Sequence, residues 1–232
     1  MSYSNPKCYA RHLNDCSEKI SNEHFISRRI LTLWDNHSGE AYGFPWIKGD
    51  SKKMFITAIK SKVLCKKHNE MLKDIDGTAF NFFKEIFDPQ ENGKFFNGYT
   101  LERWFMKLLF GLVSPGNAQY QNKSLKNWTP DKKWLETLFY GKSIPKFSGL
   151  HFVTSKKRYN AQPKSMHFQP TFKISTKEPV AIAVAMEEFI FLYAMEKLPP
   201  KNSGSNTTDT IYHSNSINII CKNRSHQINL IW

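Results

Sequence analysis

The spacing of apolar residues changes near residue 69 of this chain. From there they recur at steps of three and four, which is the spacing of one face of a helix. The residues with this spacing are Leu72, Ile75, Ala79, Phe82 and Ile86. The Asp88-Pro89 step then favours a stop, because proline restricts the residue before it to extended conformations. The pattern therefore predicts a helix that ends at about residue 88.

Two more helices are predicted in the middle of the chain. In the run LERWFMKLLFGLV the apolar side chains share one wide face, and Thr100 stands before it as a candidate cap. The run PDKKWLETLFYG (130–141) has Pro130 near its first position and Gly141 just past its end, the usual order of these residues at helix termini. Residues 73–145 are thus expected to form a helical region.

The two ends of the chain lack this helical periodicity. Five segments near the C-terminus, 149–155, 165–175, 180–195, 209–222 and 226–232, are rich in β-branched and aromatic residues. They predict an antiparallel sheet within residues 146–232, packed on the helices. Residues 1–67 contain many turn formers and short strands around 53–65. We expect an α+β protein with a small N-terminal module over residues 1–72, whose last helix continues to about residue 88.

The composition is that of a globular protein with excess positive charge. The 232 residues include 18 phenylalanines, enough for a sizeable core, and the formal net charge is +13. This charge favours a polyanionic partner such as nucleic acid, although it could also serve solubility alone. No segment has the apolar stretch of a secretory signal or the ~18–20 apolar residues that cross a bilayer. We expect a cytoplasmic protein without a membrane partner.

Three of the four cysteines lie in the first 65 residues, and a histidine follows the third at zinc-ligand spacing. Cys8 and Cys16 come first, and Cys65 and His68 form a Cys-x2-His step. Thiolate and imidazole are ligands that Zn²⁺ prefers, and four of them complete a tetrahedral structural site. His12 could replace one of the first two cysteines, and the alternative is a set of ordinary buried thiols. We favour zinc, which would supply folding energy to a segment without an evident core.

A second group of polar residues accompanies this metal set. Glu23 and His24 follow the first cysteine pair, and Asn69 directly follows His68. If zinc joins the two half-sites, Asn69 would lie near the strand that carries Glu23 and His24. Carboxylate and amide oxygens are ligands for Mg²⁺, and a neighbouring imidazole could deprotonate water for attack on a phosphodiester.

The order C-S-x-x-I-S-x-E-H-x-I-S followed by L-C-x-x-H-N resembles the HNH endonuclease superfamily over about residues 8–72. The resemblance implies a ββα-metal module on a treble-clef scaffold, held by the four zinc ligands. It also implies His24 as general base, with Glu23 and Asn69 as ligands of a catalytic Mg²⁺ or Mn²⁺. Glu23 stands where the family usually has Asp or His. The middle Asn of the signature is missing, and Lys60 lies near its place.

By this resemblance the protein is expected to be a metal-dependent endonuclease or nickase that hydrolyses phosphodiester bonds, with DNA favoured over RNA as its partner. The resemblance also implies a role in anti-phage defence. Because the middle Asn is missing, a rival hypothesis stays open, in which the module is a non-catalytic zinc-binding adaptor for nucleic acid or protein. A third hypothesis is an effector that stays inert until a regulatory ATPase or sensor protein activates it.

Other basic residues are candidates for contacts with nucleic acid. Arg28 and Arg29 follow the Glu-His pair, Lys60 precedes the second cysteine pair, and Lys156, Lys157 and Arg158 fall in the run SKKRYNAQPK. Each group could contact phosphates, or it could form a solvated turn.

Asp76 is a polar exception on the first predicted helix. It falls close to the apolar face, so we expect it to cap the helix or to pair with an interior basic group rather than to take part in catalysis. The chain contains no G-x-S-x-G, P-loop or Gly-rich dinucleotide motif, which gives no support to those enzyme classes.

Overall fold

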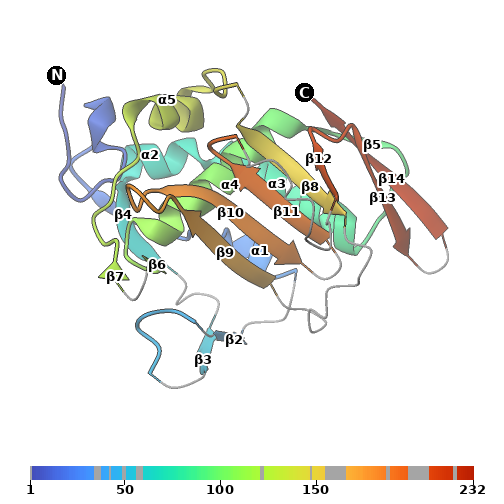
Figure 1. Cartoon of the computed structure of the whole chain (residues 1–232), viewed down its shortest axis with the longest axis horizontal. Coiled ribbons are helices and arrows are strands. Elements are labelled where there is room, and N and C mark those ends of the chain that lie inside the picture. Colours follow the sequence, from blue (N-terminus) through green and yellow to red (C-terminus); the bar gives the residue numbers. More distant parts are fainter. Residues whose placement is uncertain are drawn as a thin grey trace.

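The computed structural model describes residues 2–33, 38–41, 43–48, 51–55, 60–120, 123–146, 148–154, 166–186, 189–197, 209–221 and 224–232. These residues form an α+β fold, as expected (Figure 1). None of the helices found there is long and apolar enough to cross a membrane. The helices are η1 Arg11–Leu13, α1 Arg28–Leu31, α2 Lys66–Met71, α3 Lys73–Phe87, α4 Gly98–Val113 and α5 Lys132–Tyr140. The strands are β1 Ile20–Glu23, β2 Ser38–Ala41, β3 Lys52–Phe55, β4 Ser61–Cys65, β5 Lys94–Asn97, β6 Gln119–Tyr120, β7 Lys123–Ser124, β8 Gly149–Thr154, β9 Met166–Phe172, β10 Pro179–Met186, β11 Phe189–Ala194, β12 Asp209–Tyr212, β13 Ser216–Cys221 and β14 Arg224–Ile231.

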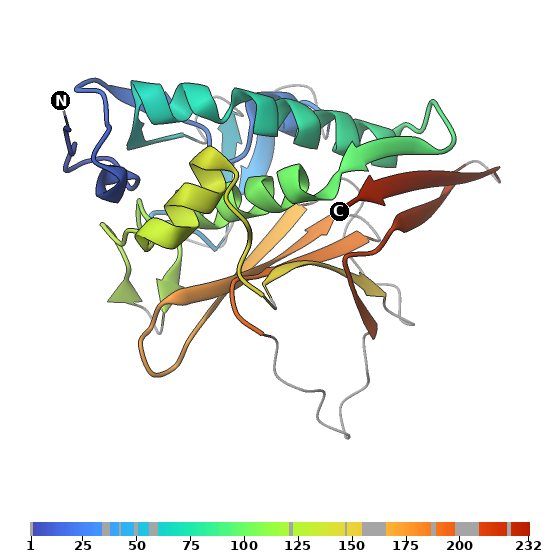
Figure 2. The ribbon, with the colours of Figure 1, turned by 90° about the horizontal axis from the view of Figure 1, so that it is seen from above.

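A five-stranded sheet forms one side of the molecule. Its strand order is β12-β8-β11-β10-β9, and every neighbouring pair in it is antiparallel. Figure 2 shows this sheet on one side of α4, with α2 and α3 on the other side. The antiparallel sheet predicted for the C-terminal region is confirmed, and the run 180–195 forms a hairpin of two strands, β10 and β11.

Helix α4 lies in the centre because its sequence is apolar on nearly every side. Of its 16 residues, only Tyr99, Thr100 and Arg103 are not buried. Its cap is Asn97, whose side-chain oxygen accepts a hydrogen bond from the backbone N–H of Thr100 at 2.9 Å. The prediction that Thr100 caps this helix was therefore wrong. The short amide of Asn97 reaches the third helical residue, so the helix begins before the predicted cap.

The first predicted helix is divided in two. Leu72 ends α2 and precedes α3, so the helical segment that was expected from about residue 69 to 88 is interrupted at this residue. The third predicted helix, α5, is confirmed. Gly141 follows it with a φ of 65°, the left-handed conformation that glycine adopts at helix ends without strain.

The N-terminal segment belongs to the main core, contrary to the expectation that it has none. Tyr9, Phe25, Ile30 and Leu64 are buried in the same apolar cluster as α4. Gly111 of α4 permits this approach, because a Cβ atom there would lie 2.7 Å from the Cβ atom of Phe25. These residues have no regular spacing in the sequence, since their burial depends on a helix that comes later in the chain.

Strands β13 and β14 form a separate sheet with β5. The order of this three-stranded sheet is β13-β14-β5, and β14 pairs in parallel with β5. The expectation of one C-terminal antiparallel sheet thus holds for β8 to β12 only. Strand β5 stands directly before α4, so the predicted helical region contributes a strand to the C-terminal part of the fold. The predicted boundaries at residues 72 and 145 stay predictions.

Strands β1 and β4 form an antiparallel pair that carries the candidate site. Ile20 lies opposite Cys65, and Glu23 lies opposite Ser61. Helix α1 and strands β2 and β3 fall between these two strands in the sequence, and α2 begins directly after β4. Glu23 thus ends β1, Cys65 ends β4, and α2 carries His68 and Asn69.

Candidate metal centre and the polar cluster around His24

The thiols of Cys8, Cys16 and Cys65 and the imidazole of His68 come together in one buried group. Their four ligand atoms all lie within 4.8 Å of one another. The Sγ atoms of Cys8, Cys16 and Cys65 lie 3.6, 3.9 and 3.2 Å from the Nδ1 atom of His68. Three thiols and one imidazole at such distances fit a structural Zn²⁺ site. His12, the alternative ligand, is exposed on η1 and is not part of the group.

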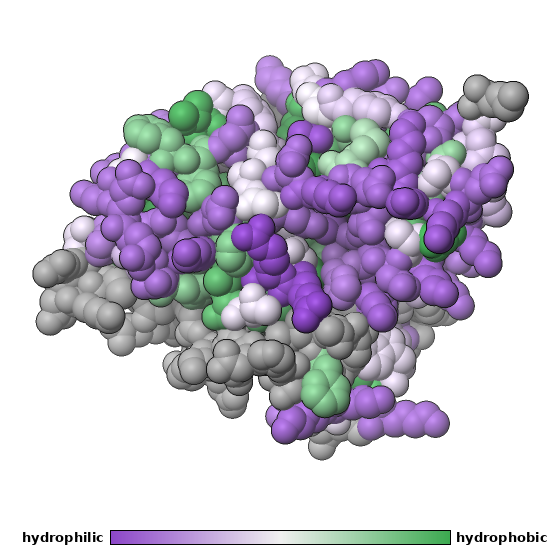
Figure 3. Space-filling model, turned by 180° about the vertical axis from the view of Figure 1, so that it is seen from behind, coloured by the Kyte–Doolittle hydropathy of each residue, from purple (hydrophilic) through white to green (hydrophobic). Residues whose placement is uncertain are grey.

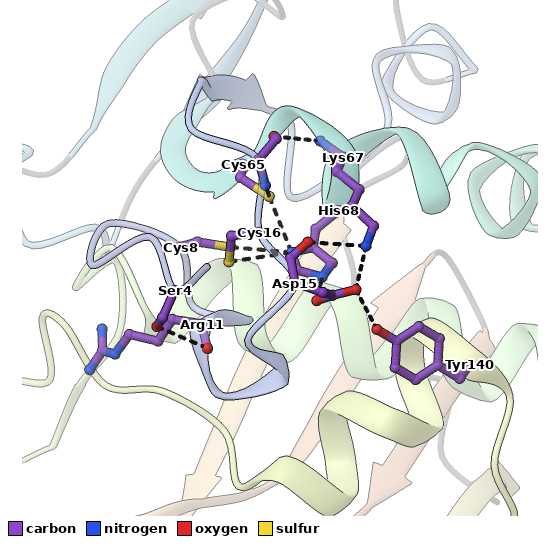
Figure 4. Close-up of polar contacts among 10 residues, drawn as sticks. Ser4, Cys8, Arg11, Asp15, Cys16, Cys65, Lys67, His68 and Tyr140 are labelled. Carbon is purple, nitrogen blue, oxygen red and sulfur yellow. Dashed lines mark hydrogen bonds and ion pairs between the residues drawn. The ribbon is translucent and has the colours of Figure 1, made fainter. Parts of the chain in front are cut away.

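Each half of this group is positioned by its own local structure (Figure 4). The short helix η1 lies between Cys8 and Cys16 and returns the chain so that both thiols approach α2. Cys65 ends β4 and His68 lies on α2, so one strand–helix junction presents the other two ligands. The backbone N–H of Ser17 donates a hydrogen bond to the Sγ atom of Cys65 at 3.3 Å, which favours a thiolate there.

Asp15 contacts the imidazole of His68 at the ring nitrogen that does not face the thiols. Its Oδ1 atom lies 3.0 Å from Nε2 of His68, so Nδ1 is the nitrogen that faces the thiols. Its Oδ2 atom accepts hydrogen bonds from Lys67 and, at 2.6 Å, from the hydroxyl of Tyr140. Burial raises the pKa of Asp15, but the bonds from Lys67 and Tyr140 outweigh burial and hold it below its usual value. A carboxylate that orients a histidine ligand in this way is a common partner of zinc sites.

The buried thiols favour a divalent cation in this group. Burial raises the pKa of the Cys8 thiol, because a thiolate would be poorly solvated there. Zn²⁺ would reverse this preference, since it binds the deprotonated thiols and compensates their charge. The residues present therefore fit zinc in both donor type and burial.

A second, separate cluster surrounds a buried lysine of α4. The Nζ atom of Lys107 lies 2.8 Å from a carboxylate oxygen of Glu23 and 2.8 and 2.7 Å from the two oxygens of Asp76. Glu23 and Lys107 are 3% and 1% exposed. Burial raises the pKa of Glu23 to about 6, against the opposing effect of Lys107. The prediction that Asp76 pairs with an interior basic group is confirmed.

His24 stands next to this cluster, one residue past the end of β1. It is half-buried, and its Nε2 atom has no hydrogen-bond partner among the described residues. Burial lowers the pKa of His24, and the positive charges of Lys60, Lys107 and Arg28 lower it further. The nearby negative charge of Asp76 opposes this effect, but the net shift is downward, so the imidazole is uncharged at neutral pH.

The geometry of the described residues gives no support to the Mg²⁺ or Mn²⁺ site that was expected between Glu23 and Asn69, which stays a prediction. The carboxylate of Glu23 is buried against the ammonium of Lys107, which already compensates its charge. Asn69 lies on α2 directly after His68, one of the four candidate zinc ligands Cys8, Cys16, Cys65 and His68 (the zinc group). The structure thus links Glu23 to Lys107 and Asp76 rather than to Asn69.

The weaker candidates for nucleic-acid contact have different settings. Arg28 and Arg29 are exposed on α1, and the guanidinium of Arg29 lies 4.1 Å from the ring centre of Phe80. Lys60 is exposed just before β4. Figure 3 shows hydrophilic side chains over much of the face seen from behind. Lys156, Lys157 and Arg158 lie outside the described residues.

Two residues of the site were missed by sequence reasoning. Lys107 had a usable signal, because a lone lysine within the apolar run FMKLLFGLV must find a buried counter-charge. Asp15 had no comparable signal. Its partner Tyr140 is 125 positions away, and only the folded chain brings α5 to the zinc group.

No protein-family model, curated protein or solved structure matches the chain. The function is therefore inferred from the residues and their geometry alone.

Proposed function

We propose that the protein is a zinc-stabilised nuclease of the HNH type, which hydrolyses phosphodiester bonds in nucleic acid, with DNA as the first candidate. The observation that carries this proposal is the setting of His24. It is an uncharged, half-buried imidazole with Arg28 and Lys60 nearby. An uncharged imidazole can accept a proton from water, and the exposed cations beside it attract phosphate.

In this proposal His24 takes a proton from a water molecule as that water attacks the phosphorus atom. The bond between phosphorus and the 3′ oxygen breaks, and the departing oxygen takes a proton from solvent. Arg28 and Lys60 contact the non-bridging oxygens, and their charges offset the negative charge that develops in the transition state. Lys107 is buried, so it acts as a positioning residue that fixes β1 to α4 and helps keep His24 uncharged. Zinc bound to the Cys/His group would stabilise the junction of β4 and α2.

The variant His24→Ala tests this proposal. Supercoiled plasmid DNA and single-stranded RNA are each incubated with zinc-loaded protein, with and without Mg²⁺ or Mn²⁺. We expect cleavage by the unchanged protein and a loss of about 10²–10⁴-fold in the variant, the usual contribution of a general base. His12→Ala is the matched control, because His12 is exposed near the zinc group but is not one of its ligands. Cleavage that survives in His24→Ala contradicts the assigned base.

The ion pair between Glu23 and Lys107 favours a second candidate function, a zinc-binding adaptor without catalysis. A carboxylate that is already compensated has little affinity for a catalytic metal. In that case Arg28 and Lys60 bind phosphates without turnover. If the unchanged protein never cleaves either nucleic acid, but retards DNA in a gel and loses this ability in the double variant Arg28→Gln/Lys60→Gln, the adaptor is the correct assignment.

A further inference from the structure

A pocket of about 840 Å³ opens between the start of α4, the end of α5 and strands β8 and β12. Residues 141–146 lead from α5 towards β8 (Figure 2). They form part of the pocket wall. Its size lies in the range of small-molecule sites. The three residues of α4 that escape burial, Tyr99, Thr100 and Arg103, all line it, and no residue of the zinc group or of the His24 cluster does.

The charged residues of this pocket have one sign. Arg103, Lys142, Lys146 and Lys197 line it, and none of its described lining residues is Asp or Glu. Lys142 also pairs with Glu136 of α5 at 2.9 Å, a contact between two partly exposed side chains. Four cations around one cavity attract an anionic ligand.

The start of α4 adds to this preference. Asn97, Tyr99 and Thr100 line the pocket at the N-terminal end of a 16-residue helix. The helix dipole favours negative charge at such an end, although the Asn97 side chain already accepts a hydrogen bond from the N–H of Thr100. Arg103 stands one turn further along, where its Nε atom donates a hydrogen bond to the carbonyl of Leu138 at 2.9 Å and so fixes the guanidinium.

An aromatic stack forms another wall. The ring of His213 lies parallel to Trp232 on one side and to Tyr212 on the other, with centres 3.9 and 3.8 Å apart. Tyr99 meets His213 and Trp232 edge-on. Tyr99 and Tyr212 both line the pocket and are each 45% exposed. Exposed aromatic rings beside cations are suited to stack on a planar base.

His151 supplies an unsatisfied polar group at the same place. It lines the pocket, and neither of its ring nitrogens has a hydrogen-bond partner among the described residues. A neutral imidazole offers one donor and one acceptor. Buried polar atoms of this kind usually have partners, so a ligand with hydroxyl groups or a polar base edge would supply the hydrogen bonds that the His151 ring lacks.

Glu102 lies behind the wall and does not cancel the positive charge. Its carboxyl accepts a hydrogen bond from the backbone N–H of Leu150 at 2.6 Å and lies 2.8 Å from Nε2 of His213. Burial raises the pKa of Glu102 to about 8, so this group is mostly uncharged at neutral pH. Gly149 makes the arrangement possible, because a Cβ atom there would collide with the carboxyl of Glu102.

We propose that this pocket binds a nucleoside monophosphate unit. The phosphate lies against the cations and the start of α4, the base stacks on Tyr99 or Tyr212, and His151 contacts a hydroxyl or a polar edge of the base. The same chemistry occurs in a free nucleotide and at the 5′-phosphorylated end of a nucleic-acid strand, and the experiment distinguishes these two sources.

Isothermal titration calorimetry on the whole zinc-loaded protein tests this proposal. The probes are AMP, GMP, CMP, UMP, adenosine and inorganic phosphate, together with one oligodeoxynucleotide with and without a 5′-phosphate. If the source is a free nucleotide, at least one monophosphate binds about tenfold or more tightly than adenosine and phosphate, since both parts contribute. If the source is a strand end, only the phosphorylated oligonucleotide binds. No saturable binding of any monophosphate or phosphorylated strand overturns the proposal.

Lys132, the first residue of α5, and Lys142, two residues past the end of this helix, provide a matched pair of variants. Lys132 and Lys142 both pair with Glu136, and their side chains are 63% and 60% exposed, but only Lys142 lines the pocket. We expect Lys142→Gln to weaken nucleotide binding by roughly fivefold to tenfold, about one charge-assisted hydrogen bond, and Lys132→Gln to leave it unchanged. Equal effects of the two variants contradict binding in this pocket.

The outcome is independent of the proposed nuclease activity. The titrations are run with His24→Ala protein as well, in which phosphodiester cleavage is not expected, and the readout is heat of binding alone. A failure of the cleavage assay therefore leaves the pocket proposal intact, and a failure of the titration leaves the assignment of His24 intact.

Discussion

Lys107 carries a positive charge inside the most apolar helix of the chain. Burial alone would lower its pKa, but Glu23 and Asp76 outweigh burial and raise it, so the lysine stays protonated. Such buried ion pairs contribute little net stability compared with apolar residues, yet removing one partner is costly because the other charge is left without compensation. The cluster therefore determines how β1 docks on α4.

The variant Lys107→Met is predicted to destabilise the fold by about 3–5 kcal/mol at pH 8. Glu23 has a folded pKa of about 6 against an ordinary value of 4.5, so its protonated form favours the folded state, and this contribution is lost as the pH rises through about 6. Without Lys107 the pKa of Glu23 rises further. The loss should then be clearly smaller at pH 5, where Glu23 is mostly protonated, as measured by urea unfolding at both pH values.

Lys84→Met is the control for this measurement. Lys84 is exposed on α3, so its replacement should change the free energy of unfolding by no more than ~0.5 kcal/mol at either pH. A pH-independent loss in Lys107→Met would show that the lysine stabilises the fold through Asp76 or through packing of its aliphatic chain rather than through Glu23.

The pH profile of cleavage reports on His24. A general base must be uncharged, so activity should rise with pH and reach its half-maximal value below the ordinary imidazole pKa of 6.5, because burial and the nearby cations lower the pKa of His24. Lys60→Glu replaces a repelling cation with an attracting anion and should move this point to higher pH. Initial rates over a pH series measure both positions.

Lys62→Glu provides the comparison for that profile. Lys62 is exposed on β4 and is not among the groups that shift the pKa of His24. Its replacement changes the net charge by the same amount as Lys60→Glu, and it should leave the half-maximal pH in place. A common shift in the two variants would assign the effect to net charge rather than to the neighbourhood of His24.

At the scale of elements, α4 organises the fold because α3, α5, the five-stranded sheet and β14 all pack on it. Gly111 is where the N-terminal segment comes closest, since a Cβ atom there would lie 2.7 Å from Phe25. Glycine-to-alanine changes inside helices normally stabilise by about 1 kcal/mol. We predict that Gly111→Ala instead destabilises by about 1–3 kcal/mol, because the backbone of β1 and its following turn would have to move.

Gly77→Ala is the matched substitution on α3. A Cβ atom at Gly77 meets nothing within 4 Å, so this variant should gain about 0.5–1 kcal/mol. Thermal unfolding of the two variants side by side measures the difference. If Gly111→Ala were as stable as Gly77→Ala, the contact between α4 and the N-terminal segment would be looser than described.

The elements divide into those that sequence patterns can reveal and those that they cannot. Helices α3, α4 and α5 and most C-terminal strands were predicted, because periodicity and β-branched runs are local properties. The break at Leu72 and the cap at Asn97 depend on one or two residues within otherwise helical signals. The parallel pairing of β14 with β5 joins segments more than 130 residues apart, and no local pattern specifies such a partner.

At the scale of the whole molecule, the zinc group joins residues 8–16 to residues 65–68 while the sheet lies elsewhere. Removing the metal with a chelator is predicted to increase amide hydrogen exchange in η1, β1, β4 and α2, because the buried thiols lose their common ligand. Exchange in β8, β10 and β11 should stay slow. Loss of protection over the entire chain would show that zinc stabilises the whole fold.

Asp15→Asn extends this prediction to the group behind His68. An amide can no longer supply the charge that orients the imidazole, so zinc affinity should fall by about 10–100-fold in competition with a coloured chelator. Asp74→Asn serves as the comparison, since Asp74 lies in the first turn of α3 outside this group. Equal affinities in the two variants would mean that Asp15 has no part in metal binding.

How much of the candidate site could be predicted follows from where its residues lie. Cys8, Cys16, Cys65 and His68 were predicted because ligand type and spacing carry the chemistry by themselves. The link between Glu23 and Lys107 joins residues 84 positions apart, and it replaced the expected partner Asn69. The pocket at the start of α4 draws its walls from four distant segments, so its charge pattern exists only in the folded chain.

Strands β1 and β4 are paired although residues 24–60 separate them, and the zinc group lies at the end of that pair. The segment between them is therefore a loop whose two ends, its base, are held together by the strand pair. The entropy of closing such a loop grows only with the logarithm of its length, at about 0.6 kcal/mol for each doubling. Insertions that leave the buried Phe25 and Ile30 in place should therefore cost little once the base is formed.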